Sequence, residues 1–342
     1  MSDCPGVMFV LESFRRHMDN GRWLFQLGME SMGWLSAGAG VPEPGIDSTD
    51  VAQVIDEHKP AAAIFWPRYE WDHNQWVGPE VQPEHEFRNI EALFDHPEIL
   101  RIAVFHDAAS ARKQQKAWHD ELQPDVYLVW YHPRSIAPYA PHVPVERMLR
   151  TYHIVNDRCI DWEIPLHEPK GICLISGACS GCYPLRIKAI EWAKHGKLGP
   201  GVDVLEHPGY GQTGSVSADY VQTLSQYRVA LCTASVYGFA LRKIFEATLV
   251  GCRVITDLPE YDRLPMIDKN LVRIDDFEDS RLTLTALNTS IHTAAAEWDS
   301  KIQDIFRARA AARYDYTAET ARIAGAIEQI CRERETTCQP TP

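Results

Sequence analysis

The stretch SVYGFALRKIFEATLVGCRVITD, residues 235–257, decides the expected fold. Its middle has the apolar spacing of a short helix over 241–250, which ends at Gly251 because glycine readily adopts the left-handed conformation of a helix C-terminus. The β-branched run Val254–Thr256 then has the composition of a buried strand. The stretch therefore predicts a helix followed by a strand, which is the repeating unit of a parallel α/β sheet.

The predicted helix also carries a pattern of charges. Arg242 and Lys243 precede Glu246 by four and three residues, so all three side chains share one edge of the helix. Tyr237 and Gly238 come just before it, where free backbone N–H groups and the positive end of the helix dipole favour an anion. Such a site can hold a nucleotide, with the cations on phosphate and the carboxylate on ribose hydroxyls. A surface ion pair on an ordinary crossover helix fits the same spacing.

Short continuous hydrophobic runs recur along the chain and alternate with amphipathic segments. Such runs are typical of parallel strands that are buried on both faces. They predict strands at 7–11, 61–66, 101–105, 126–130, 171–176, 202–206, 228–233 and 252–256. Helices are predicted at 50–58, 187–195, 218–226 and 241–250, and in a helical tail over 286–331 with a break at 314–316. The pattern indicates an α/β protein with two parallel sheets.

Length and composition limit the class of protein. The 342 residues are enough for two domains of roughly 170 residues each. Nine scattered cysteines, an odd number, are typical of reduced intracellular thiols. No uncharged stretch reaches the roughly 20 residues of a membrane span, and no signal peptide is visible. We therefore expect a cytoplasmic protein, and the net charge of −13 disfavours nucleic acid as a partner without excluding it.

The segment LRKIFEATLVGCRVITD, residues 241–257, resembles the nucleotide-binding segment of GT-B glycosyltransferases. In that family a Lys-x-x-Glu-Ala stretch is followed by a glycine and a short apolar strand. The resemblance implies that Glu246 holds the donor ribose and that Lys243, with Arg242, faces the diphosphate. Retaining members often have a second glutamate eight positions earlier, where this chain has Gly238. The stereochemistry is therefore open.

Further segments resemble the same family from Gly171 onwards, whereas the first half matches only in architecture. GICLISGACSGCYPLRIKAIEWAKHG, residues 171–196, is similar to the first strand, loop and helix of a donor domain, as in spore-maturation-type transferases and, more distantly, phage DNA β-glucosyltransferase. The resemblance implies that Gly177 and Gly181 let the backbone approach phosphate and that Arg186 contributes a cation. Residues 219–235 and 308–330 resemble the segment before the donor helix and the terminal helices.

The resemblance implies two Rossmann-like domains with parallel sheets facing across a cleft. Residues 1–165 would form the acceptor-binding domain, residues 166–315 the nucleotide-sugar donor domain, and residues 316–342 a helix returning to the first domain and a tail. The implied activity is transfer of a sugar from a nucleotide-sugar co-substrate to a hydroxyl-bearing acceptor. No tightly bound metal is expected, because fixed cations and helix N-termini would stabilise the leaving diphosphate. The nucleotide, sugar and acceptor stay open.

A transferase of this kind needs a base for the acceptor hydroxyl. His106 and Asp107 directly follow the third predicted strand, and Asp72 follows the second on a longer, tryptophan-rich loop. Parallel sheets bind ligands at the carboxyl ends of their strands, and imidazole and carboxylate both suit proton removal near neutral pH. We favour Asp107 with His106 beside it, and we keep Asp72 as the alternative and His132 as a weaker one. Hydrogen-bonded polar pairs in loops also fit these positions.

Two motifs compete with this interpretation. GYGQTG, residues 209–214, satisfies the G-x-G-x-x-G pattern of dinucleotide binding, but it follows the second strand of its half and lacks the expected acidic partner. The family resemblance instead makes it a loop near the donor base, where His207 and Tyr210 are available for stacking. Cys179 and Cys182 form a lone C-x-x-C without the second pair that a structural zinc site needs. Small loop residues or a redox pair explain them.

Rival functions share these features. A GT-B-fold nucleotide-sugar epimerase would bind the same donor but need no acceptor. An NAD-dependent oxidoreductase would use the loop 177–181 for phosphate and Glu206 for ribose. A non-catalytic module would bind a nucleotide sugar without turnover. A DNA-base-modifying glycosyltransferase is a subtype that the acidic net charge disfavours.

Overall fold

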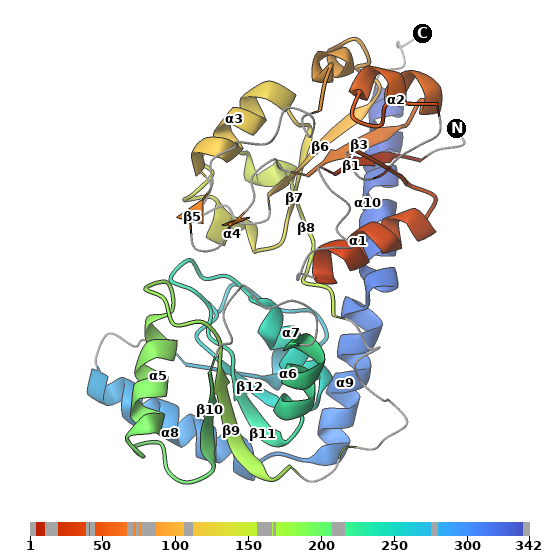
Figure 1. The fold of residues 1–342 in the computed structure, drawn as a ribbon. Coiled ribbons are helices and arrows are strands. Elements are labelled where there is room, and N and C mark those ends of the chain that lie inside the picture. Colours follow the sequence, from red (N-terminus) through yellow and green to blue (C-terminus); the bar gives the residue numbers. More distant parts are fainter. Residues whose placement is uncertain are drawn as a thin grey trace. The chain divides into compact units, whose positions relative to one another are not determined.

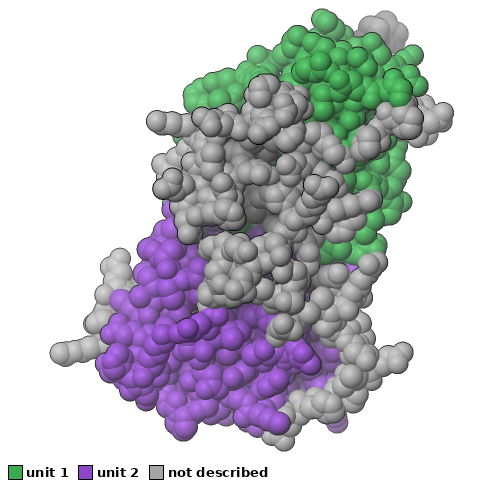
Figure 2. Space-filling view, in the orientation of Figure 1, with its two compact units in different colours: residues 1–152, 316–342 green, residues 153–315 purple. Residues whose placement is uncertain are grey.

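A computed structural model describes residues 5–10, 20–38, 41, 45–66, 71–72, 75–76, 87–105, 112–155, 166, 169–206, 216–274 and 280–337. The chain forms two compact units (Figure 1, Figure 2). Unit 1 comprises residues 1–152 and 316–342, and unit 2 comprises residues 153–315. Each unit has its own parallel sheet, so the predicted α/β class with two parallel sheets is confirmed.

Unit 1 is built on a six-stranded sheet of order β2-β1-β3-β6-β7-β8, in which all neighbouring strands are parallel. Its strands are β1 (Val7–Phe9), β2 (Leu35–Ala37), β3 (Ala62–Phe65), β6 (Leu100–Phe105), β7 (Val126–Val129) and β8 (Met148–Arg150). β1, β3 and β7 are buried along their whole length, which is why their sequences are continuously apolar. A separate antiparallel hairpin joins β4 (Trp71–Asp72) to β5 (Gln75–Trp76).

The helices of unit 1 lie between its strands, except for the last one. They are α1 (Asn20–Ser31), α2 (Val51–His58), η3 (Ile90–Phe94), α3 (Arg112–Leu122), α4 (Pro133–Ile136), η4 (Val145–Arg147) and α10 (Tyr316–Thr337). α10 packs against α1 (Figure 1). A Cβ on Gly28 of α1 would lie 2.3 Å from Thr320 Oγ1 of α10, so the absence of a side chain there permits the close approach.

A buried carboxylate ties α10 to the end of β8. Glu319 is fully buried, and its Oε1 accepts hydrogen bonds from Thr151 Oγ1 at 2.9 Å and from the Tyr152 backbone N–H at 3.0 Å. Arg322, one turn further along α10, pairs with the same carboxylate at 2.6 Å. Because the charge has both a cation and hydrogen-bond donors, it can be buried at this position.

Unit 2 is built on a five-stranded parallel sheet of order β10-β9-β11-β12-β13. Its strands are β9 (Gly171–Ser176), β10 (Val202–Leu205), β11 (Tyr227–Leu231), β12 (Arg253–Thr256) and β13 (Leu271–Arg273). Its helices are α5 (Pro184–Lys194), α6 (Val216–Leu224), α7 (Arg242–Leu249), η6 (Asp268–Asn270), α8 (Ser280–Ala296) and α9 (Ser300–Tyr314). The helix and strand predicted from the opening stretch are therefore confirmed as α7 and β12.

One face of this sheet holds a continuous apolar core under α5 and α8. Alternate strand residues, among them Ile175, Leu231 and Ile255, point into it. Trp192 of α5 and Ile291 of α8 pack against the same cluster. α6 and α7 contact β11 and β12 from the other face (Figure 1). The sheet is thus covered on both sides.

None of the described helices combines the length and the apolar character that crossing a membrane requires.

Candidate functional site

The strand order of unit 2 marks a place for a ligand. β9 is the first strand of the unit, and the next two strands in the chain, β10 and β11, pair with its two edges. The connections that leave β9 and β11 therefore diverge at the carboxyl ends of the strands. In open parallel sheets of this order, ligands bind at such a switch point. The loop after β9, residues 177–183, and the connection from β11 to α7 form its two sides.

The loop after β9 needs glycine at its first position only. Gly177 has φ +118°, and a Cβ there would lie 2.7 Å from Arg186 Nη1. Nothing lies within 4 Å of a Cβ built on Gly181, so a side chain would fit at that position. Gly177 thus lets the backbone pass close over the arginine, whereas the predicted phosphate contact of both glycines is untested.

Arg186 lies in the first turn of α5 and is only 2% exposed. Its Nε donates a hydrogen bond to Thr233 Oγ1 at 3.1 Å, and its Nη1 donates to the Ala178 carbonyl at 2.9 Å. The guanidinium also lies 4.0 Å from the centroid of the Tyr183 ring, within cation–π distance. The structure therefore uses Arg186 to hold the loop after β9 to the end of β11.

Lys243 reaches from α7 to the end of β9. Its Nζ donates to Ser176 Oγ at 3.3 Å and lies 4.5 Å from the centroid of the Tyr220 ring. The Tyr220 hydroxyl is also within hydrogen-bond distance of Ser176 Oγ, at 3.0 Å. Burial lowers the pKa of Lys243, and the nearby Glu246 carboxylate opposes that shift. The ammonium is thus fixed at the carboxyl edge of the sheet, where the sequence predicted a cation.

Arg242 and Glu246 form the ion pair that their spacing predicts. Arg242 Nε lies 2.9 Å from Glu246 Oε1, and the two side chains are 23% and 12% exposed. The predicted ribose ligand therefore has a fixed orientation, and one of its oxygens faces an arginine.

The connection from β11 to α7 is tied to the loop after β9 through the backbone. The Val236 N–H donates to the Cys182 carbonyl at 2.9 Å, and the Tyr237 hydroxyl lies 3.7 Å from Cys182 Sγ. Gly238 has φ +67°, and a Cβ there would lie 3.0 Å from Pro259 Cγ. The two sides of the switch point are thus one connected structure.

Asp257 is a residue of this edge that the sequence analysis did not single out. It follows β12 directly, and its Oδ1 accepts a hydrogen bond from the Ala234 backbone N–H at 2.5 Å. Burial raises the pKa of this carboxyl to about 6, while the hydrogen bond and the charge of Arg186 act in the opposite direction. An acidic residue at the carboxyl end of a predicted strand was the signal that could have identified it.

Comparison with known proteins rests on structure. No protein-family model matches the chain, and no curated protein matches its sequence. Sucrose-phosphate synthase from Thermosynechococcus elongatus aligns over 96% of this chain and 100% of its own, with 11% identity and a TM-score of 0.52. A glycosyltransferase from Rickettsia africae aligns over 96% of this chain and 98% of its own, with 10% identity and a TM-score of 0.55. HepE from Anabaena, solved with UDP-glucose, aligns over 95% of this chain and 99% of its own, with 12% identity and a TM-score of 0.53.

The chain has the GT-B fold. At this level of identity the likeness establishes the fold and nothing finer. The expectation of a GT-B architecture is confirmed, and the more distant resemblance to phage DNA β-glucosyltransferase stays a prediction. Within the GT-B fold, unit 2 contains the residues that we predicted to bind the donor.

The structure describes some of the residues predicted for acceptor chemistry and not others. His106 and Asp107 lie outside the described residues, as do His207 and Tyr210 of the predicted donor-base loop. The backbone of Asp72 forms β4, opposite Gln75 of β5. Their roles stay predictions.

His132, the weaker candidate for the base, caps a helix. Its Nδ1 accepts a hydrogen bond from the Arg134 backbone N–H at 3.2 Å at the start of α4. Burial lowers the pKa of His132 to about 4, and the charges of Arg150 and Arg134 add to the effect. A neutral imidazole whose Nδ1 accepts a hydrogen bond carries its proton on Nε2. His132 thus has a structural role at the start of α4, and its role as a base stays a prediction.

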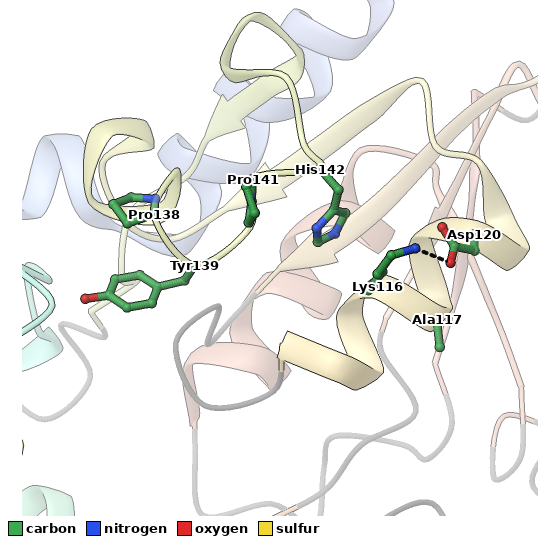
Figure 3. Close-up of a pocket in the computed structure, with 7 residues that line it drawn as sticks. All are labelled: Lys116, Ala117, Asp120, Pro138, Tyr139, Pro141 and His142. Atoms are coloured by element: carbon green, nitrogen blue, oxygen red, sulfur yellow. Dashed lines mark hydrogen bonds and ion pairs between the residues drawn. The ribbon is translucent and has the colours of Figure 1, made fainter.

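Two pockets have linings that include none of the predicted donor residues. In unit 1, α3 and the segment around Tyr139 line a pocket of about 510 Å³ (Figure 3). Lys116 and Asp120 of α3 form an ion pair of 2.6 Å on one wall, and His142 lies between them and Tyr139 in Figure 3. A second pocket of about 340 Å³ in unit 2 is lined by residues 263–266, 268–269 and Arg309.

No group of three or more His, Cys, Asp or Glu side chains that could hold a metal ion occurs among the described residues. Cys179 is an exposed free thiol, and Cys182 is a partly exposed one. The expectation of a metal-independent reaction stays a prediction.

Proposed function

We propose that the protein is a glycosyltransferase that takes a sugar from a nucleotide-sugar donor held at the switch point of unit 2. The observation that carries the proposal is that Arg186 and Lys243 reach the ends of β9 and β11, while the Glu246 carboxylate lies near Lys243 on α7. Solved structures of HepE, which shares the fold, contain UDP, or UDP with glucose, or UDP-glucose. We therefore propose a nucleotide sugar as the donor and UDP as the first nucleotide to test.

The donor contacts follow from the chemistry of each side chain. Lys243 would face the diphosphate, because its ammonium is held at the end of β9. Glu246 would accept hydrogen bonds from the ribose hydroxyls, while Arg242 keeps its carboxylate oriented and balances its charge. The glycine-opened loop after β9 would let backbone N–H groups approach the phosphates.

These groups would also contribute to the rate. Negative charge builds up on the diphosphate as the bond to the sugar breaks. Cations that are already held in place stabilise this charge without reorganising, which makes electrostatic stabilisation effective. Lys243 is held by Ser176 and the Tyr220 ring, and Arg186 by Thr233 and Ala178, so neither cation has to be recruited from solvent.

On the acceptor side we propose that unit 1 supplies the base. Asp107, with His106 beside it, is our first choice, and Asp72 is the alternative. The acceptor is a molecule with a hydroxyl group, and its further chemistry is left open by the residues described.

A ligand screen tests the function directly. Thermal unfolding of the full chain is followed with UDP, ADP, GDP, CDP and dTDP, and the preferred nucleotide is then titrated by calorimetry. We expect at least one of them to raise the melting temperature, since a ligand that binds only the native state stabilises it by mass action. If none of the five shifts the transition at millimolar concentration, the proposed donor site is wrong.

Lys243→Met distinguishes a phosphate contact from simple packing. Loss of the charge should weaken binding of the nucleoside diphosphate much more than binding of the bare nucleoside, because Coulombic attraction acts only on the phosphates. Calorimetry with both ligands on the folded variant measures the two losses. Equal losses for the two ligands would mean that Lys243 acts through packing.

A further inference from the structure

We propose that Arg186 and Asp257 form an internal clamp that positions the two loops of the switch point in unit 2. Asp257 is then a positioning residue, and Arg186 acts on a donor through the loops it holds rather than by direct contact. The existence of the clamp stands on the geometry of the chain alone. Its effect on donor binding rests on the proposed function.

Arg186 forms the first half of the clamp. Its two donated hydrogen bonds go to different loops, Nη1 to Ala178 after β9 and Nε to Thr233 after β11. With a side chain 2% exposed and stacked on Tyr183, the guanidinium lies beneath the loop surface. A buried arginine that bridges two loops in this way fixes their separation.

Asp257 forms the second half. It brings in a third strand, because it follows β12 and accepts the N–H of Ala234, the residue next to Thr233. The segment after β11 is therefore bonded to Arg186 at Thr233 and to Asp257 at Ala234. Through these two side chains the carboxyl ends of β9, β11 and β12 are connected.

The charges of the two side chains are coupled. Arg186 favours the ionised form of Asp257, against the effect of burial. Arg186 also lowers the pKa of Lys243, so the field of the guanidinium reaches the predicted diphosphate ligand. Loss of either member of the clamp should therefore disturb both the backbone of the loops and the electrostatics of the edge.

The geometry explains why Gly177 is needed. The backbone passes so close over Arg186 that a Cβ would lie 2.7 Å from its Nη1. A cation that acted only as a surface ligand would not require this approach. The loop is shaped around the arginine, as expected if the arginine is part of its support.

Hydrogen–deuterium exchange of the full chain, without any ligand, tests the clamp. We expect Asp257→Ala to raise exchange in peptides covering 232–241 by about tenfold, since one hydrogen bond that limits local opening is lost. Asp257→Asn should not raise exchange in this segment, because its amide oxygen can accept the same bond. Arg186→Lys keeps the charge but not the two-loop geometry, and it should raise exchange in 177–183.

Milder and matched variants complete the test. Thr233→Val replaces the hydroxyl that accepts the Arg186 hydrogen bond by a methyl group. This variant is used in the exchange experiment if Asp257→Ala does not fold. Glu260→Ala removes a 55% exposed carboxylate three residues after Asp257 and should leave exchange in 232–241 unchanged. If Asp257→Ala, or Thr233→Val in its place, and Arg186→Lys all exchange like wild type in both segments, the clamp does not exist.

UDP binding separates the clamp from the proposed function. With the clamp intact as judged by exchange, failure of the wild-type chain to bind any nucleoside diphosphate would refute the donor site and leave the clamp standing. If the wild type binds UDP, we expect Asp257→Ala to weaken binding about tenfold and Asp257→Asn to restore it. Loss of binding in Asp257→Asn with wild-type exchange would show that Asp257 contacts the ligand and would overturn its positioning role.

Discussion

Glu246 is the residue on which the donor assignment depends most directly. Its carboxylate is largely buried and is oriented by Arg242 through an ion pair of 2.9 Å. A carboxylate held in this way can accept hydrogen bonds from two neighbouring hydroxyl groups with little further loss of side-chain entropy. The same residue was selected from the sequence, because its spacing from Arg242 and Lys243 can be read without any structure.

Replacing Glu246 by alanine should weaken nucleoside diphosphate binding by about 1–3 kcal/mol, the range for hydrogen bonds to a charged acceptor. Calorimetry on the folded variant gives the value. Glu191→Ala removes an exposed carboxylate from α5 and should leave the affinity unchanged. Wild-type affinity in Glu246→Ala would remove the ribose assignment.

Asp257 predicts a pH dependence of stability. Burial raises its folded-state pKa to about 6, above the value of 3.8 expected when the group is solvated. The folded protein therefore holds this proton more tightly, and the associated stability is present below pH 4 and lost as the pH rises through about 6.

Asp257→Asn isolates that contribution. Its free energy of unfolding should exceed that of the wild type by about 2–3 kcal/mol at pH 8, with the excess shrinking between pH 6 and pH 4. Urea unfolding of both chains at a series of pH values measures the difference, and other titrating groups cancel in it. A difference that does not change with pH would contradict the raised pKa.

At the scale of elements, most of the strands that were readable from the sequence are buried over much of their length, whereas β10 was predicted although it is only partly buried. β9 begins and ends where the sequence predicted it, and β1, β3, β6, β7, β10, β11 and β12 fall within two residues of their predictions at each end. β2, β8 and β13 were not predicted. Each lies at an edge of its sheet and includes a polar or charged residue (Ser36, Arg150 or Arg273), so none presents a continuous hydrophobic run.

Helix α3 was not predicted either, for a different reason. Its sequence RKQQKAWHDEL is mostly charged or polar, and of its side chains Trp118 and Leu122 are the ones known to be buried. Two apolar residues four positions apart give too weak a hydrophobic periodicity for a helix to be predicted from the sequence. The break in the long C-terminal helical segment was visible, because α9 ends at Tyr314 and α10 begins at Tyr316, inside the predicted 314–316.

Glu319 predicts how strongly α10 is held. Glu319→Ala leaves Thr151, the Tyr152 N–H and Arg322 without their shared acceptor in a buried place. Loss of one partner from a buried charged network costs about 3–5 kcal/mol. Urea unfolding followed by circular dichroism should show that loss. Glu333→Ala, in an exposed turn of the same helix, is the control, and an equal effect of both substitutions would contradict the anchoring role.

At the scale of the whole molecule, the expectation from sequence was more complete for the donor half than for the acceptor half. The predicted donor residues that the structure describes lie on α5, on α7 and in the loops after β9 and β11, and several of them are close neighbours in the sequence. Asp257 escaped notice because its partner Ala234 lies 23 residues away and offers only a backbone N–H. Side chains that act on a backbone group leave no paired signal in a sequence.

Asp107→Asn tests the division of labour between the two units. A positioned base contributes roughly 10²–10⁴-fold, so turnover should fall by that factor. Donor affinity should stay within about twofold of wild type, because the donor residues belong to unit 2. Turnover with a hydroxyl acceptor and UDP titration measure the two effects. If Asp107→Asn keeps more than about a tenth of the turnover and Asp72→Asn does not, the base is Asp72.

The position of α10 at the end of the sequence affects the order in which the two units can fold during translation. Residues 1–152 leave the ribosome before residues 153–342, yet their unit includes α10, which begins at Tyr316. Until α10 is translated, Thr151 at the end of β8 has no Glu319 to bond to, and Gly28 of α1 has no Thr320 to pack against. Unit 2 is one continuous stretch and needs nothing made after residue 315. The half that is synthesised second can therefore be finished first, and a nascent chain stalled before Tyr316 should expose an incomplete first half to chaperones.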